Sequence, residues 1–200
     1  MASIVGHTFA GIIAKQLYRT ELPAKKEKLL LCLSMFLALM PDLDIVIYML
    51  LRPSGMIPHR GLSHGIPFIA ASSFFFAVLT YKYFGISKGK LFVFYFSALF
   101  SHLALDFFMG AGPKIAFFAP FSNLTFLSPI TFIPWAYYST TATGLFQTLL
   151  YPPVILGFYL EFMIFLPLVL IFKKSQLNKF NIVFFATSVL SVIFTISYYN

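Results

Sequence analysis

Long apolar runs separated by short polar stretches dominate the chain. A helix needs about 20 predominantly apolar residues to cross a bilayer. On this basis the pattern predicts helical segments over Ser3–Leu17, Leu29–Leu51, Leu62–Phe84, Leu91–Met109, Leu145–Phe172 and Ile182–Tyr199. Because the first segment is short, it can be a tilted or re-entrant piece instead of a full span. We expect an all-α, polytopic transmembrane helix bundle of about five to six membrane helices, built as a single domain over residues 1–200.

Two stretches depart from this pattern. Residues 110–144 are broken by Pro and Gly and are rich in Phe and Tyr, with Trp135 among them. This composition is typical of a segment that lies at the level of the lipid headgroups. Near the start of the fifth segment, Pro152 and Pro153 are expected to bend the helix.

The composition agrees with an integral membrane protein. Of the 200 residues, 60% are hydrophobic and 10% are charged, whereas soluble domains carry about 25% charged residues. A chain so poor in charge cannot cover a water-facing surface. No cleavable signal peptide is expected, because the stretch after Met1 lacks a basic start. The single cysteine, Cys32, excludes an internal disulfide and is expected to be a buried spacer.

The net charge of +8 does not indicate a nucleic-acid partner, because the basic residues fall between the apolar runs and mark membrane topology. One set of connections carries Lys15, Arg19, Lys25, Lys26, Lys28, Lys82, Lys88, Lys90, Lys173, Lys174 and Lys179. The other set carries Arg52, Arg60 and Lys114. Since positive charge favours the cytoplasmic side, the first set is predicted to be cytoplasmic, with both termini outside.

The outer ends of the predicted helices collect the residues that carry chemistry. Asp42 and Asp44 lie within an otherwise apolar segment, where one aspartate at the centre of a helix costs about 2.5–3.5 kcal/mol on insertion scales. All four histidines and three of the six acidic residues fall near the same membrane face: His7, Asp42, Asp44, His59, His64, His102 and Asp106. Their shared depth predicts one site, assembled from several helices near the extracytoplasmic face.

The local spacings favour metal binding. His102 and Asp106 are four residues apart, so a helix projects them from one face. Pro41 interrupts the backbone hydrogen bonds of its helix, which allows Asp42 and Asp44 both to face inward. Ser63 is a candidate cap of the following helix. A mixed nitrogen and oxygen donor set suits one or two divalent ions, zinc first and manganese or iron next, better than calcium or magnesium. Coordination would offset the cost of the buried aspartates.

A metal site is one of several interpretations of this cluster. The aspartates could form buried ion pairs with Arg52 or Arg60, and the histidines could be structural. A proton or ion path is a further alternative, although such a path should cross the bilayer instead of clustering at one depth. Glu161, near the middle of the fifth segment, lies apart from the cluster. It either pairs with a buried donor or supports the site.

Four motifs carry these residues: GHTFAG (6–11), PDLD (41–44), HRGLSH (59–64) and SHLALD (101–106). In order and spacing they resemble the YdjM-like family of membrane-bound, predicted metal-dependent hydrolases, and PFSN (120–123) resembles a further element of that family. The resemblance implies a bundle of membrane helices. Together with the topology predicted from Lys and Arg, we expect a bacterial inner membrane protein whose site faces the periplasm or outside. Gly65 departs from the family, which often has Ser there. More distantly, the His and Asp pattern is similar to zinc-dependent phospholipase C, which implies phosphoester chemistry.

We therefore expect metal-assisted hydrolysis of a phosphoester in a membrane lipid or lipid-linked substrate at the outer leaflet. The metal ligands are expected among the seven histidines and aspartates of the cluster. His64 is a ligand or a general acid, and Arg60 and Arg52 can hold a phosphate or anchor the chain at the headgroups. A metal-binding scaffold for a partner protein and a transporter without hydrolytic activity are the alternative functions.

Overall fold

The computed structural model describes residues 3–51, 59–108, 114–129, 147, 150–173, 183–184, 186–190 and 193. Its main elements are helices, with the order α1 (Ile4–Leu17), α2 (Ala24–Leu39), η1 (Met40–Asp42), α3 (Leu43–Leu51), η2 (Leu62–His64), α4 (Ile66–Phe84), α5 (Lys88–Phe107) and α7 (Pro152–Phe172). Within these residues, four helices are long and apolar enough to cross a membrane: Ala24–Tyr48, Ile66–Phe84, Lys88–Phe107 and Pro152–Phe172. The predicted all-helical bundle is thus confirmed for the described residues, with these four helices as candidate membrane spans, and the total number of spans stays a prediction.

The helix ends follow local chemistry. Pro41 has no N–H to donate, and at this point α2 passes into the short 3₁₀ turn η1 before the chain resumes as α3. The predicted break at Pro41 is therefore present. Gly85 ends α4 with φ 70°, a left-handed conformation that glycine adopts without steric cost.

Two sequence expectations are wrong. Pro152 lies at the first position of α7 and Pro153 follows it, so this pair begins the helix instead of bending it, as expected where a missing N–H costs nothing. Cys32 is exposed on α2 and is not a buried spacer. The sixth predicted segment and the aromatic stretch around Trp135 fall largely outside the described residues.

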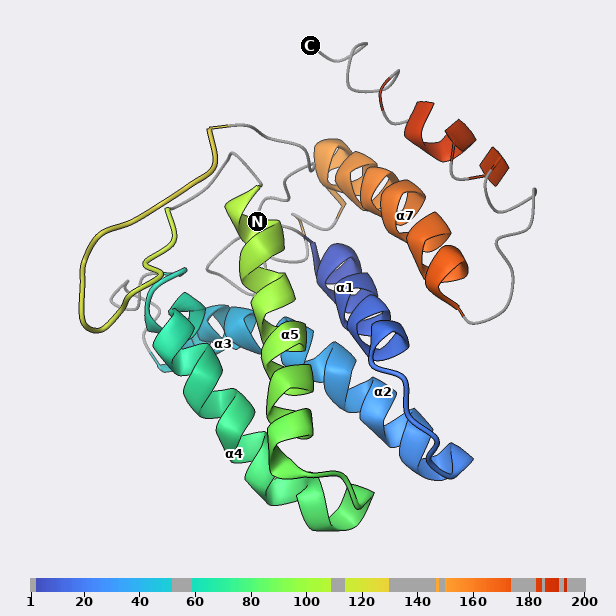
Figure 1. The fold of residues 1–200 in the computed structure, drawn as a ribbon. Coiled ribbons are helices and arrows are strands. Elements are labelled where there is room, and N and C mark those ends of the chain that lie inside the picture. Colours follow the sequence, from blue (N-terminus) through green and yellow to red (C-terminus); the bar gives the residue numbers. More distant parts are fainter. Residues whose placement is uncertain are drawn as a thin grey trace.

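Helix α5 lies at the centre of the bundle and packs against α1, α2 and α4, while α1 also packs against α7 (Figure 1). The core consists of Leu30, Leu37, Ile69, Ala77, Phe84, Leu91, Phe94, Tyr95, Ala98, Leu99 and Leu103. Helices α1 and α2 approach closely because Gly11 has no side chain, and the Ser34 hydroxyl donates a hydrogen bond to the Gly11 carbonyl at 2.7 Å. The α1–α2 contact fixes the helix that carries His7.

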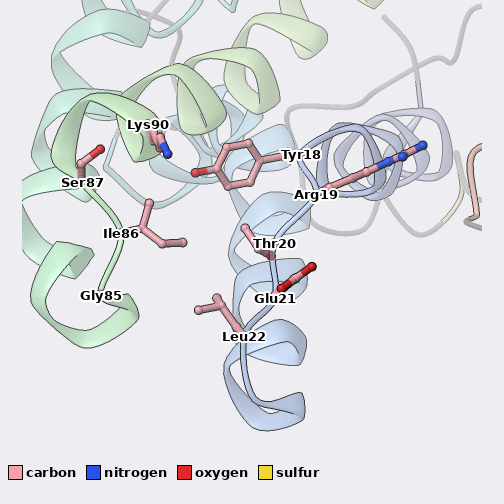
Figure 2. A pocket seen from close by; sticks show the side chains of 9 residues that line it. All are labelled: Tyr18, Arg19, Thr20, Glu21, Leu22, Gly85, Ile86, Ser87 and Lys90. Carbon is pink, nitrogen blue, oxygen red and sulfur yellow. The ribbon is translucent and has the colours of Figure 1, made fainter.

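The bundle has two chemically different ends. Near the connections α1–α2 and α4–α5 lie lysines of the set predicted to be cytoplasmic, including Lys26 and Lys88. A cavity of about 510 Å³ opens there, lined by residues that include Tyr18, Thr20 and Lys90 (Figure 2). Histidines and aspartates of the cluster do not line it. They lie at the opposite end, with the start of α1 and the end of α5.

Candidate metal centre

Residues from five elements meet at one end of the bundle. They are His7 (α1), Asp42 (η1), Asp44 (α3), His59 and His64 (before and in η2), and His102 and Asp106 (α5). Most are fully or almost fully buried. The predicted convergence of these residues is confirmed, although they are spread over a hundred residues of sequence.

Asp42 and Asp106 lie at the centre of the cluster. His102 Nε2 lies 3.3 Å from Asp42 Oδ1 and 3.8 Å from Asp106 Oδ2. His64 Nε2 lies 3.6 Å from that same Asp42 oxygen and 3.5 Å from Asp106 Oδ2. His7 Nε2 approaches Asp106 Oδ1 at 3.5 Å. Several imidazole nitrogens therefore point at two carboxylates, which is the donor set of a transition-metal or zinc site.

The donors form two groups that share Asp106. One group contains Asp42, His59, His64 and Asp106, and the other contains His7, His102 and Asp106. Within each group, one ligand atom of every residue lies within 4.8 Å of the others. Because Asp106 is common to both groups, the arrangement could hold one ion or two.

Three of the histidines are oriented by hydrogen bonds at Nδ1. His59 Nδ1 lies 2.9 Å from Asp44 Oδ1, and His102 Nδ1 lies 2.8 Å from the Ala38 carbonyl oxygen. Because these oxygens can only accept, each Nδ1 carries the proton, and each Nε2 presents its lone pair to the centre. Metal-binding histidines are held in this way by an acceptor behind the ring. Asp44 thus lies behind the rings, outside the two ligand groups.

Ser63 connects His64 to that outer carboxylate. Its hydroxyl donates to Asp44 Oδ2 at 2.8 Å and lies 2.9 Å from His64 Nδ1. The serine oxygen can therefore accept the Nδ1 proton of His64, which again leaves Nε2 facing the centre. The sequence prediction that Ser63 caps α4 is wrong, because α4 begins after Gly65 without a side-chain cap.

Arg60 is a buried cation of the cluster. Its Nε lies 3.0 Å from Asp106 Oδ2, and its backbone N–H donates to Asp44 Oδ2 at 3.3 Å. The residue has φ 66°, a conformation that costs a non-glycine residue on the order of 1 kcal/mol or more. The predicted Arg60 ion pair is thus present. Arg52, its predicted companion, lies outside the described residues.

The segment 114–129 covers the loop that carries Arg60. Ala116 N donates to the Arg60 carbonyl at 3.2 Å. A side chain at Gly65 would place Cβ 2.7 Å from the Ala119 carbonyl oxygen, so the close approach requires glycine.

The buried charges of the cluster do not balance. Three aspartates face one arginine, so the cluster carries a net charge of −2 when its histidines are neutral. Both carboxylate oxygens of Asp42 are buried without a hydrogen-bond partner among the described residues. Uncompensated buried charge is costly, and a divalent cation would supply the missing charge and contacts. The residues present therefore fit a metal ion.

One protonation state reflects the same excess of negative charge. Burial lowers the pKa of His64, but contacts with Asp106 and Asp42 raise it by more, to about 9. When no ion is bound, a proton on His64 thus supplies part of the positive charge that the carboxylates require.

Comparison with known proteins agrees with the motifs. A family described as YdjM inner membrane protein matches residues 1–197. The chain belongs to the YdjM family. No curated protein and no solved structure matches the chain. The YdjM match extends through α7, well beyond the motifs that first indicated it, whereas the distant similarity to phospholipase C has no counterpart in the comparisons and stays a prediction.

Proposed function

We propose that this YdjM family member is a membrane-bound, metal-dependent hydrolase that acts on a phosphoester of an amphiphilic substrate. The observation that carries the proposal is the buried cluster of four histidines and two central aspartates, three of whose Nε2 atoms are aimed inward by acceptors at Nδ1. A cluster that served only stability would not need this excess of negative charge, since apolar packing of the same volume is usually at least as stabilising.

The proposed metal ligands form two groups of residues. Asp42, His59 and His64 would hold one ion together with Asp106, and His7 and His102 would complete a second with the same carboxylate. Zinc is the first candidate, and manganese or iron also suit the donors. A bound divalent ion would polarise a phosphoryl oxygen and activate a water molecule.

The chain's own residues would bind and orient the substrate. Arg60 offsets the charge of Asp106, and a guanidinium is also the preferred group for a phosphate. If only the group of His7, His102 and Asp106 holds an ion, His64 would keep a proton through its contacts with Asp106 and Asp42 and could give it to the leaving group. Asp44 and Ser63 keep the rings of His59 and His64 in place.

An apolar groove beside the cluster supports a lipid-like substrate. It has a volume of about 270 Å³ and is lined by Met40, Leu43, Asp44, Ile47, Leu62, Ser63 and Phe68. Its polar end is formed by Asp44 and Ser63, which contact the site histidines. The volume is slightly below that of pockets for whole drug-sized ligands, so it suits part of one hydrocarbon chain.

Charge distribution supports an outward-facing site. The lysine-rich end of the bundle is opposite the cluster, and the positive-inside rule assigns that end to the cytoplasm. The substrate would then be a phospholipid or lipid-linked phosphate of the outer leaflet.

The test is elemental analysis of detergent-purified protein, combined with phosphate or headgroup release from a panel of phospholipids and lipid phosphates. The wild type should contain one or two divalent ions and should hydrolyse at least one lipid. His102→Ala should insert normally but lose hydrolysis and the ion of the group His7, His102 and Asp106. Metal without turnover would favour the scaffold, solute flux without hydrolysis would favour a transporter, and full activity of His102→Ala would contradict the proposed site.

A further inference from the structure

Glu161 is a buried carboxylate on α7 that the proposed reaction does not use. It is almost completely buried in a helix long and apolar enough to cross the membrane, where an acidic residue is costly unless it has partners. The partners identify what this residue does.

The carboxylate of Glu161 binds the first turn of α1. Its Oε1 accepts a hydrogen bond from Ser3 N at 2.8 Å, and its Oε2 accepts one from Gly6 N at 2.9 Å. The Ser3 hydroxyl donates to Oε2 as well. The free N–H groups and the positive end of the helix dipole thus balance the carboxylate. Gly6 permits the contact, because a Cβ there would lie 3.0 Å from the Glu161 carboxyl carbon.

His7 follows directly after Gly6 and differs from the other histidines of the cluster. His59, His64 and His102 each have an oxygen within 2.9 Å of Nδ1. Neither ring nitrogen of His7 has a hydrogen-bond partner among the described residues. Its ring stacks on His102, with centroids 3.7 Å apart, so its position depends on where the backbone of α1 lies.

We infer that Glu161 is a positioning residue for His7. The His7 ring has no hydrogen-bond acceptor among the described residues to orient it, and Glu161 instead fixes the start of the helix that carries His7. This inference rests on the proposed metal site. It couples α7 to the ligand group of His7, His102 and Asp106, and it predicts a selective effect of Glu161 on the ion bound there.

The experiment compares metal content and the Co²⁺ absorption spectrum in purified protein. Glu161→Ala should lower the affinity for the ion at His7 by about 10–100-fold, the usual cost of losing an outer contact of a metal site. The ion held by His59 and His64 should stay, so that the spectrum matches that of His7→Ala. Glu161→Gln, which can still accept one of the two N–H bonds, should regain part of the affinity.

Phe165→Ala is the matched control. Phe165 lies on the same helix and stacks on Phe9 in the second turn of α1, with ring centroids 6.4 Å apart. It should lower thermal stability and keep the metal content. If Phe165→Ala loses the ion as Glu161→Ala does, or if Glu161→Ala and Glu161→Gln keep wild-type affinity, the inference is wrong. A wild type that binds no metal would overturn the proposed function together with it.

Discussion

The Nε2 atoms of His64 and His102 lie 3.1 Å apart, although 38 residues separate them in the sequence. Both rings have an oxygen partner at Nδ1, so both Nε2 atoms present lone pairs to the same space. Two lone pairs at this distance repel each other unless a proton or a cation lies between them. The pair is therefore stable only with a positive species bound, which makes metal binding and proton binding competitors.

This competition predicts the pH dependence of metal binding. Because His64 has a pKa of about 9 without metal, an incoming ion must displace one proton below that pH. Metal affinity should rise about tenfold per pH unit between roughly pH 6.5 and 9 and then level off. Chelator-buffered zinc titrations measure this slope, and His64→Gln should flatten it. The same slope in His64→Gln would assign the proton elsewhere.

The shared position of Asp106 predicts how ion stoichiometry responds to mutation. Asp106 belongs to both ligand groups, whereas His59 belongs to one. Asp106→Asn should remove all bound metal, and His59→Gln should remove one ion and leave the other. Elemental analysis of the purified variants distinguishes these outcomes. An ion that stays bound in Asp106→Asn would mean that one of the two groups does not need Asp106.

Asp44 is a predicted ligand on sequence grounds, but its oxygens contact His59, Ser63 and the Arg60 backbone. We therefore expect Asp44→Asn to keep the number of ions and to weaken their binding by about 10–100-fold. Ser63→Ala should act in the same direction and more weakly, because it affects His64 alone. Metal titrations of both variants measure the change, and loss of a whole ion in Asp44→Asn would instead make Asp44 an inner ligand.

Sequence spacing predicts which residues meet, because HxxxD fixes two side chains on one helix face and Pro41 interrupts another helix. It could not divide the aspartates of PDLD into roles. The 3₁₀ turn Met40–Asp42 directs Asp42 to the centre and leaves Asp44 on the first turn of α3. This difference depends on the residue at which α2 ends, which the spacing of the motif does not determine. The Ala38 carbonyl behind His102 has no side-chain signature at all, and the Glu161 contact with Gly6 depends on how α7 packs.

The groove beside the site predicts chain-length selectivity. Leu62 lines it and is exposed, so Leu62→Trp should narrow it. Hydrolysis of a long-chain lipid phosphate should fall at least about tenfold relative to a short-chain analogue with the same headgroup. Phe74→Trp, at an exposed apolar position on α4 that does not line the groove, is the control and should leave the ratio unchanged. An unchanged ratio in Leu62→Trp would exclude the groove as the chain site.

Two glycines provide a matched test of the packing that holds α1 against α2. A Cβ on Gly11 would lie 2.8 Å from both Met35 Cα and the Ser34 carbonyl oxygen, whereas a Cβ on Gly89 would meet nothing within 4 Å. Backbone atoms cannot rotate away as a side chain does, so Gly11→Ala must push the two helices apart. We expect it to lower the free energy of unfolding by about 1–3 kcal/mol.

Gly89→Ala should leave stability unchanged or raise it by up to about 1 kcal/mol, because alanine favours the helix over glycine. Thermal unfolding in detergent measures both variants against the wild type. Because α1 carries His7, the loss in Gly11→Ala should be accompanied by weaker metal binding, and Gly89→Ala should bind metal normally. Equal stability of the two variants would contradict the close packing of Gly11 against Ser34 and Met35.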